Sequence, residues 1–189
     1  MFNFLKQFIL RPIEIGTPLP LGPSLSKYIV EMAKVGSGKI LVELGPGTGP
    51  VTREIIAQKS KDSNFLAIEL NPSFYEILKV EFPDLKLFKD SAEHIQRILA
   101  GEGYVKCDRI VSGLPWAAFD QELQVKILHA AHAALEDDGI FVTVTYIHSP
   151  HLPAGKTFKK LLTETFRKVE LSRIVWKNVP PAFVYICTK

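Results

Sequence analysis

Residues 41–51 read LVELGPGTGPV, and the architecture of the chain can be worked out from this stretch. Three glycines, Gly45, Gly47 and Gly49, alternate directly after a run of apolar residues that predicts a buried strand. Pro50 then stands where the first turn of a helix tolerates proline. A strand, a glycine-rich turn and a helix in this order indicate an α/β domain that binds a ligand at the carboxyl end of the strand.

The alternation of strand and helix continues along the chain. Apolar, β-branched runs predict strands at 39–44, 64–69, 85–88, 107–112 and 139–146, with helices at 50–59, 72–82, 92–99 and 121–135, and Asp138-Gly139 predicts a helix-to-strand turn. After a helix at 156–166, strands at 169–176 and 183–188 follow each other directly and form a hairpin. We therefore predict a doubly wound, Rossmann-like α/β fold with a mostly parallel seven-stranded sheet, an antiparallel C-terminal hairpin strand and helices on both faces.

Length and composition favour one domain. The 189 residues can bury one core, and no linker or internal repeat divides them. We predict an N-terminal helical extension over 1–36 and a ligand-binding domain over 37–189. Cys107 and Cys187 form no disulfide framework, His129 and His132 lack a third ligand, and no stretch reaches the roughly 20 apolar residues of a membrane span. We expect a cytoplasmic protein without a metal.

The glycine spacing distinguishes between ligand classes. A triphosphate-binding loop has Lys followed by Ser or Thr after its last glycine, whereas Pro50-Val51 follow Gly49 here. The dinucleotide pattern GxGxxG places a glycine at position 50, which is also Pro50. Alternate glycines with Glu43 two residues before them match the GxGxG loop of S-adenosylmethionine-dependent methyltransferases instead. A tight turn without a ligand is the alternative.

Acidic residues follow the next two predicted strands. Glu69, followed by Leu70, lies about twenty residues beyond the loop, where a carboxylate can accept both ribose hydroxyls. Asp90-Ser91 follows the third strand, where a carboxylate can accept the adenine amino group, although Ser91 could also cap a helix. Acids at three successive strand ends beside one glycine loop favour an adenosine-bearing cofactor, S-adenosylmethionine.

The fourth predicted strand ends in Ser112-Gly113-Leu114-Pro115-Trp116. Methyltransferases that act on the amino groups of nucleobases carry Asn/Asp-Pro-Pro-aromatic or Asn-Leu-Pro-aromatic at this place. There, polar oxygens accept hydrogen bonds from the target amine and the ring packs on the substrate. Ser112 replaces the Asn or Asp here, and the ring of Trp116 also suits an alkylated ammonium through cation–π attraction. A proline turn with a core tryptophan is the alternative.

These motifs together carry a family resemblance. VELGPGTGPVT, IEL, SGLPW and NVPPAFVY resemble the bacterial phospholipid N-methyltransferases, relatives of the ribosomal RNA adenine dimethylases, and the opening FLKQFILRPIEIGTPLPLGPSLSKYIVEMA is similar too. The resemblance implies a class I methyltransferase fold and methylation of the amine of phosphatidylethanolamine, stepwise toward phosphatidylcholine. It implies cofactor binding by Glu43, Gly45, Gly47, Gly49, Glu69, Leu70, Asp90 and Ser91, and an amine site at Ser112, Leu114, Pro115 and Trp116. Trp116 is bulkier than the residue expected in the lipid enzymes, which leaves the exact amine open.

The N-terminus and the charge pattern favour a membrane partner. On a helix, Phe2, Phe4, Leu5, Phe8 and Ile9 share one face, opposite Lys6 and Arg11. Such a helix can lie on an anionic bilayer, so we expect peripheral association with the inner face of the membrane, or it can pack as a lid over the cofactor. Residues 1–40 carry five Lys or Arg against two Glu, and residues 150–189 carry eight against two. Basic ends attract the phosphates of lipid or nucleic acid.

Two further hypotheses remain open. An RNA adenine N6-methyltransferase would have the same cofactor-binding motifs and the same basic terminal segments. Against this hypothesis, Ser112 replaces the Asn of the motif in those enzymes, and no helical domain follows the closing hairpin. A non-catalytic membrane-binding module that retained the fold would need none of the acids at the strand ends. We therefore regard nucleic acid as a less favoured partner than phospholipid. His148, Tyr28, Tyr146 and Tyr185 could assist the loss of the amine proton, and the sequence does not rank them.

Overall fold

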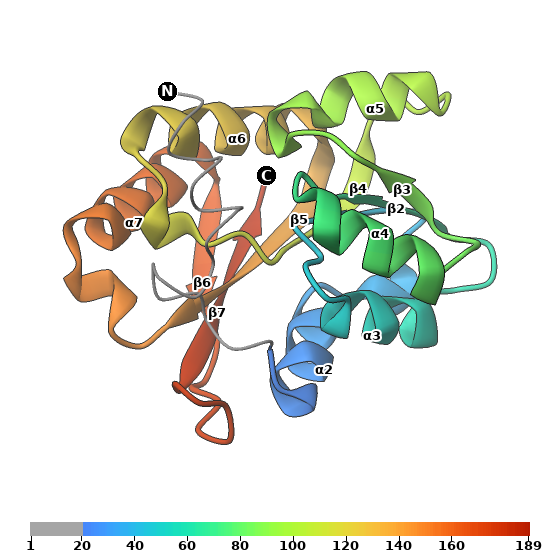
Figure 1. Cartoon of the computed structure of the whole chain (residues 1–189). Helices are drawn as coiled ribbons and strands as arrows, with labels where there is room; N and C mark the ends of the chain where they lie inside the picture. Colours follow the sequence, from blue (N-terminus) through green and yellow to red (C-terminus); the bar gives the residue numbers. More distant parts are fainter. Residues whose placement is uncertain (1–20) are drawn as a thin grey trace.

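The computed structural model describes residues 21–189, which form a seven-stranded sheet with helices on both faces (Figure 1). Its helices are α2 Pro23–Met32, α3 Pro50–Gln58, α4 Pro72–Glu81, α5 Ile95–Gly101, α6 Gln121–Ala134 and α7 Pro153–Thr165, with short 3₁₀ turns at η1 Val35–Ser37, η2 Ala92–His94, η3 Trp116–Ala118 and η4 Ser149–His151. Its strands are β1 Ile40–Leu44, β2 Asn64–Ile68, β3 Lys86–Phe88, β4 Cys107–Ser112, β5 Leu135–Tyr146, β6 Lys168–Leu171 and β7 Ala182–Thr188. The amphipathic segment expected at residues 2–9 lies outside the described residues.

The sheet has the predicted class I methyltransferase topology. Its strand order is β3-β2-β1-β4-β5-β7-β6. The first five of these strands pair in parallel, and β7 pairs antiparallel with both β5 and β6. All five parallel strands therefore end at the same edge of the sheet, and the strand order reverses between β1 and β4. Open α/β sheets bind their ligands at this edge, near such a reversal.

Alternating side chains of the strands build two cores. Val42 and Leu44 of β1 face the cluster that α5, α6 and α7 cover, whereas Leu41 faces the cluster that contains α2 and α3. Leu25 and Ile29 of α2 are fully buried in the second cluster, so α2 packs as part of the α/β layer structure. Among residues 21–189, no helix combines the length and the apolar character needed to cross a bilayer.

The helix predicted from residue 92 begins as the turn η2 and becomes α-helical at Ile95, and α7 begins at Pro153, earlier than predicted. Two strand boundaries differ from the prediction by four residues or more, for local reasons. β5 begins at Leu135, immediately after α6, because buried Leu135 pairs with Cys107; the register then shifts, and Ile140 pairs with Arg109. The expected Asp138-Gly139 turn is thus an irregularity within β5, with Asp138 at a φ of 64°. β6 is shorter than predicted because the Ser172 hydroxyl, in place of a backbone carbonyl, accepts the Val184 N–H over 2.9 Å.

Candidate functional site

The predicted site segments meet at the carboxyl edge of the parallel strands. Leu44 at the end of β1 is paired with Ile68 of β2 and with Ser112 of β4. Backbone hydrogen bonds continue these pairings into the loops, because Gly45 N donates to Ile68 O and Gly113 N donates to Leu44 O, each over 2.9 Å. The glycine loop therefore lies between the loop after β2 and the turn after β4.

The glycine loop has the backbone that its sequence predicts. Gly45, Gly47 and Gly49 have φ values of 68°, 61° and 82°, a region that residues with a Cβ rarely adopt. A Cβ at Gly45 would lie 2.6 Å from Leu114 Cδ2, and one at Gly49 would lie 2.7 Å from Phe82 Cε2, so these two glycines allow close packing. At Gly47, no described atom lies within 4 Å of the Cβ position. The loop thus leaves open the space that a cofactor needs.

Glu69 connects the loop after β2 to the glycine loop. Its Oε2 accepts the Gly47 N–H over 2.9 Å, and its Oε1 accepts the Asn71 N–H over 2.7 Å. Burial raises the pKa of the Glu69 carboxyl, and hydrogen bonds from the amides of Asn71, Gly47 and Leu70 oppose this rise. Each carboxylate oxygen has a second lone pair. Glu69 can therefore hold the loop and still accept ribose hydroxyls.

Glu43 differs from the expected cofactor ligand. It is 1% exposed, and its Oε2 accepts the Thr52 hydroxyl over 2.7 Å. Burial raises its pKa to about 8, with the Thr52 hydrogen bond opposing and the nearby Glu69 charge adding to the rise. In a strand, alternate side chains point to opposite faces, and Glu43 points toward α3 beneath the loop. Glu43 thus ties β1 to the first turns of α3 through Oε2, and direct contact of its carboxyl with a ligand stays a prediction.

Asp90 lies at the same sheet edge, after β3, and its carboxylate already has partners. Its Oδ1 accepts the Ser91 N–H over 2.8 Å and lies 2.7 Å from His94 Nδ1, and Oδ2 pairs with Arg97. Partial burial would raise the pKa of Asp90, but the hydrogen bonds from His94 and Ser91 and the Arg97 charge hold it below its ordinary value. Ser91 takes the N-cap position of η2 without a side-chain cap. Adenine recognition by this pair stays a prediction.

The turn after β4 lies against the glycine loop. A Cβ at Gly113 would lie 2.7 Å from the carbonyl oxygen of Gly45, so only glycine permits this approach. Leu114, half-buried, places its side chain beside Gly45. Buried Gln124 of α6 donates to the Trp116 carbonyl over 2.7 Å and fixes the end of the turn. The turn is thus held rigidly beside the loop.

The side chain of Trp116 is part of the core rather than a surface for a substrate. The ring is 3% exposed and stacks on Phe158, with ring centroids 4.5 Å apart. Its Nε1 donates to Thr143 Oγ1 over 3.0 Å and to Ser112 Oγ over 3.2 Å. The expected contact between this ring and the substrate is corrected accordingly, because the apolar ring has a complete set of core neighbours. Of the two readings of SGLPW, the core tryptophan fits this geometry.

Backbone and hydroxyl groups of the same turn remain candidates for the amine. Ser112 Oγ is buried, and it also accepts a hydrogen bond from the Leu114 N–H, with 3.4 Å between nitrogen and oxygen. The Leu114 carbonyl accepts the Trp116 N–H over 3.0 Å across Pro115 and has a second lone pair. The Leu114 carbonyl accepts one hydrogen bond and the buried Ser112 hydroxyl accepts two, so the carbonyl is the better candidate to accept from an amine.

The four residues proposed to assist proton loss have different surroundings. Tyr185 lies in the core, and the ring of Tyr28 has Arg173 above it at 5.1 Å. Tyr146, at the carboxyl end of β5, stacks on His148 with ring centroids 5.9 Å apart, and its buried hydroxyl has no partner among residues 21–189. Burial raises the pKa of Tyr146 to about 12, so this phenol stays protonated at neutral pH and can orient a substrate.

Several residues that shape the site carry no sequence signal. Thr52, Gln124 and Thr143 are buried polar side chains that hold Glu43 and the turn after β4 in place. Each stands in an ordinary helix or strand pattern, so only the packed fold shows its role. Gly113 belongs to the SGLPW motif. Its place at a strand end is a signal from which a close approach of its backbone to the glycine loop could have been inferred.

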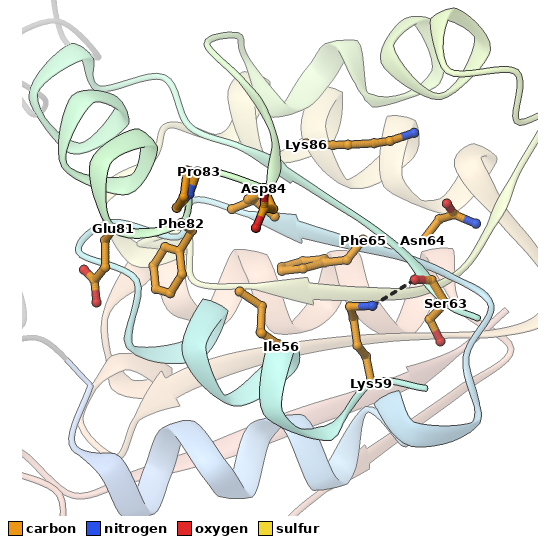
Figure 2. Close-up of a pocket in the computed structure, with 11 residues that line it drawn as sticks. Ile56, Lys59, Ser63, Asn64, Phe65, Glu81, Phe82, Pro83, Asp84 and Lys86 are labelled. Carbon is orange, nitrogen blue, oxygen red and sulfur yellow. Dashed lines mark hydrogen bonds between the residues drawn. The ribbon is translucent and has the colours of Figure 1, made fainter. Parts of the chain in front are cut away.

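A separate cavity lies at the opposite edge of the sheet. The cavity has a volume of ≈ 450 Å³. Figure 2 shows the residues that line it, which include Phe65, Phe82 and Lys86. Lys59 Nζ donates to the Ser63 carbonyl over 3.1 Å at its rim. Ser63 precedes β2 and Lys86 begins β3, so this cavity lies at the amino ends of the strands. None of the predicted site residues lines it.

Within residues 21–189, no three His, Cys, Asp or Glu side chains are grouped to hold a metal ion.

Comparison with known proteins finds similarity to methyltransferases. The chain is 28% identical over 189 residues to an ornithine lipid N-methyltransferase of Singulisphaera acidiphila, covering 98% of this chain and 94% of that protein. It is 26% identical over 119 residues to a probable ribosomal RNA small subunit methyltransferase A of Thermococcus gammatolerans, covering 61% of this chain and 39% of that protein. No family model matches the chain.

Solved structures share the fold. The O-methyltransferase of Bacillus cereus in complex with SAH superposes with a TM-score of 0.70 at 12% identity, over 99% of this chain and 91% of that one. TrmN of Thermus thermophilus superposes with a TM-score of 0.67 at 15% identity, over 98% of this chain and 53% of that one. These likenesses establish the class I methyltransferase fold.

Fold, relatives and site geometry lead to one conclusion. The strand order is that of the class I methyltransferases, and the near-full-length relative is a methyltransferase. Gly47 leaves an open cradle beside the buried carboxyl of Glu69, which suits an adenosine-bearing cofactor. The chain is an S-adenosylmethionine-dependent methyltransferase.

Proposed function

We propose that this protein transfers methyl groups from S-adenosylmethionine to the primary amine of a membrane-lipid head group, that of phosphatidylethanolamine or of an ornithine lipid. The observation that carries the proposal is the 28% identity to an ornithine lipid N-methyltransferase over 98% of this chain, a span that includes every predicted site segment. Both lipids present a primary amine at the membrane surface, and the same site can serve either.

The chain's contribution to donor binding comes from the loops at the carboxyl edge. Bound S-adenosylmethionine supplies a methyl group activated by a positively charged sulfur. Gly47 lets the backbone approach the cofactor closely, and Glu69 accepts hydroxyl groups of the ribose. Asp90 and the Ser91 amide are proposed to lie against the adenine. These groups are held by hydrogen bonds before any ligand arrives, so little reorganisation accompanies binding.

The turn after β4 is proposed to orient the amine. The second lone pair of the Leu114 carbonyl accepts one N–H of the amine, and the Tyr146 hydroxyl, which has no partner within residues 21–189, offers a second polar contact at the same sheet edge. An ammonium has no lone pair, so the amine loses its proton before or during transfer. Holding the amine lone pair in line with the methyl group and excluding water supply most of the acceleration.

A nucleic-acid substrate is the second candidate. The 26% identity to a probable ribosomal RNA methyltransferase over 119 residues favours it. That similarity spans only 39% of the RNA enzyme, whereas the lipid enzyme matches along almost its whole length. Ser112, in place of an Asn, also removes one of the amine acceptors expected in adenine methylation.

Transfer of a labelled methyl group distinguishes these substrates. The full chain is incubated with methyl-labelled S-adenosylmethionine and one acceptor: vesicles with phosphatidylethanolamine, vesicles with ornithine lipid, vesicles with only phosphatidylcholine and phosphatidylglycerol, or unmodified small-subunit ribosomal RNA. We expect label in one or both amine lipids and none in the other two samples. Label in RNA alone would overturn the proposal, and so would label in vesicles that contain no primary amine.

A further inference from the structure

The last residue of β6 and the connection to β7 expose an apolar surface at residues 171–181, here called the hairpin tip. Trp176 is 67% exposed and Val179 is 73% exposed, and Leu171 and Ile174 are exposed beside them. Large apolar side chains in this number on one short connection mark an interaction surface rather than scattered surface residues. The tip is the loop that projects at the lower end of β6 and β7 in Figure 1.

The hairpin tip is also purely basic. Its sequence, LSRIVWKNVPP, contains Arg173 and Lys177 and no carboxylate. The neighbouring Glu170 is already paired with Lys168 over 3.0 Å. Tryptophan with aliphatic side chains and cations is the combination that lies at the surface of an anionic bilayer, because the ring suits the head-group level and the cations attract the lipid phosphates.

Hydrogen bonds hold the hairpin tip in one shape. Buried Asn178 accepts the Gly22 N–H over 3.0 Å and donates to the Pro180 carbonyl over 2.7 Å. Val175 N donates to the Ala182 carbonyl over 2.7 Å. The apolar side chains are therefore presented on a fixed frame, so inserting them into a bilayer requires little ordering of the chain.

The tip lies at the same edge of the sheet as the donor site. Because β7 is antiparallel, its first residue, Ala182, pairs with Tyr146 at the carboxyl end of β5. Ile147 N donates to the Pro181 carbonyl over 3.1 Å just beyond that pair. A bilayer in contact with the tip would consequently face the edge that carries the glycine loop and the turn after β4.

We propose that the hairpin tip docks the protein on an anionic lipid bilayer and presents lipid head groups to the carboxyl edge of the sheet. The inference rests on the proposed lipid substrate. Arg173 and Lys177 meet the negative head groups, and Trp176, Val179 and Ile174 enter the boundary between head groups and acyl chains. An RNA would instead require more cations along a groove than the two on this tip.

Vesicle binding by the full chain tests the docking surface without cofactor. The protein is floated with vesicles of phosphatidylcholine containing phosphatidylglycerol. The test variant combines Trp176→Ser with Val179→Ser, and the matched control combines Val80→Ser with Val105→Ser. The control valines are 83% and 89% exposed near the opposite edge of the sheet. We expect the tip variant to bind at least about tenfold more weakly and the control to bind as the unchanged chain does.

Charge is tested separately on the same vesicles. Lys177→Ala should weaken binding about fivefold at low salt, whereas Lys61→Ala, an exposed lysine outside the tip, should leave it unchanged. Thermal unfolding of each variant shows that it remains folded. Equal binding by the tip variant and the unchanged chain overturns the proposal. The proposal is also overturned if the tip and control variants lose vesicle binding equally. It is overturned as well if the tip variant loses a dimer but keeps vesicle binding, or if the tip binds RNA alone.

Methyl transfer separates this inference from the proposed function. With long-chain amine lipid in vesicles, the tip variant should lose most of its activity through a raised apparent KM. With a short-chain, water-soluble lipid of the same head group, its kcat should match that of the unchanged chain. If no lipid is methylated by any variant while vesicle binding depends on the tip, the proposed function fails and the docking surface stands.

Discussion

At the scale of single residues, Glu43 shows how a residue beside a ligand-binding motif can also affect the stability of the fold. The carboxyl is enclosed between β1 and α3 and accepts one hydrogen bond, from Thr52. Because burial raises its pKa to about 8, the folded protein binds a proton there at neutral pH that the unfolded chain releases. This carboxyl therefore makes the stability of the fold depend on pH.

The stability contribution has a definite sign. A carboxyl whose pKa is raised by folding contributes its full stabilisation below the pKa of the unfolded chain, and this contribution is lost as the pH rises through the folded value of about 8. We expect the free energy of unfolding to fall by about 2–4 kcal/mol between pH 5 and pH 9 through this group. Glu43→Gln, which mimics the protonated carboxyl, should remove this part of the decline.

Urea unfolding at several pH values between 5 and 9 measures the effect. The control is Glu76→Gln, a change at an exposed carboxyl on α4 that should leave the pH dependence as it is in the unchanged chain. A Glu43→Gln protein whose stability declines with pH as steeply as that of the unchanged chain would contradict the assignment.

At the scale of elements, the turn after β4 joins two strands and a helix through one side chain. The Trp116 indole donates to Ser112 of β4 and to Thr143 of β5, and its ring stacks on Phe158 of α7. The sequence identified the turn and its place at a strand end. It could not show the direction of the ring, since a proline turn permits the next side chain to face either the core or a ligand.

The two tryptophans of the chain provide a matched test of that direction. Trp116→Phe removes both indole hydrogen bonds and should lower the free energy of unfolding by about 1–3 kcal/mol. Trp176→Phe, at an exposed position, should change it by less than about 0.5 kcal/mol. Because the Trp116 ring makes core contacts only, the folded Trp116→Phe enzyme should retain its kcat on a water-soluble lipid within about threefold.

Chemical denaturation and initial-rate kinetics measure the two quantities. If Trp116→Phe leaves stability unchanged and lowers kcat by a hundredfold, the ring contacts the substrate and the core assignment is wrong.

The elements were predictable where local patterns and packing agree. Apolar runs predicted β1 to β4, and Pro50 and Pro72 predicted the starts of α3 and α4. The early start of β5 depends on Leu135 pairing with Cys107, and the early end of β6 depends on the Ser172 hydroxyl. Both are tertiary contacts, which spacing along the chain does not encode. The N-terminal division at residue 36 stays a prediction, as does membrane contact by residues 2–9.

At the scale of the whole molecule, sheet topology brings distant segments to one edge. Parallel pairing places the loops after β1, β2 and β4 side by side, and the antiparallel β7 returns the hairpin tip to that edge. The glycine pattern and the strand-end acids were sufficient to predict that these segments meet at one edge of the sheet, whereas contact of their residues with the cofactor stays a prediction. They were insufficient to predict that Glu43 lies beneath the loop and that Asp90 is held by His94 and Arg97.

The loop around Gly47 is proposed to hold S-adenosylmethionine, and two glycines allow a matched test of this role. Gly47 and Gly103 both have positive φ, at 61° and 82°, and at both the Cβ position has no described atom within 4 Å. An alanine therefore introduces similar backbone strain, about 1 kcal/mol, at either position. Only the Cβ at position 47 enters the proposed cofactor space.

Calorimetric titration of S-adenosylmethionine into the two folded variants is the most direct measurement. We predict that Gly47→Ala raises the dissociation constant at least about tenfold, since its methyl group occupies space needed by the ligand. Gly103→Ala should bind with the affinity of the unchanged chain. Equal affinity in both variants, or an equal loss in both, would contradict the account.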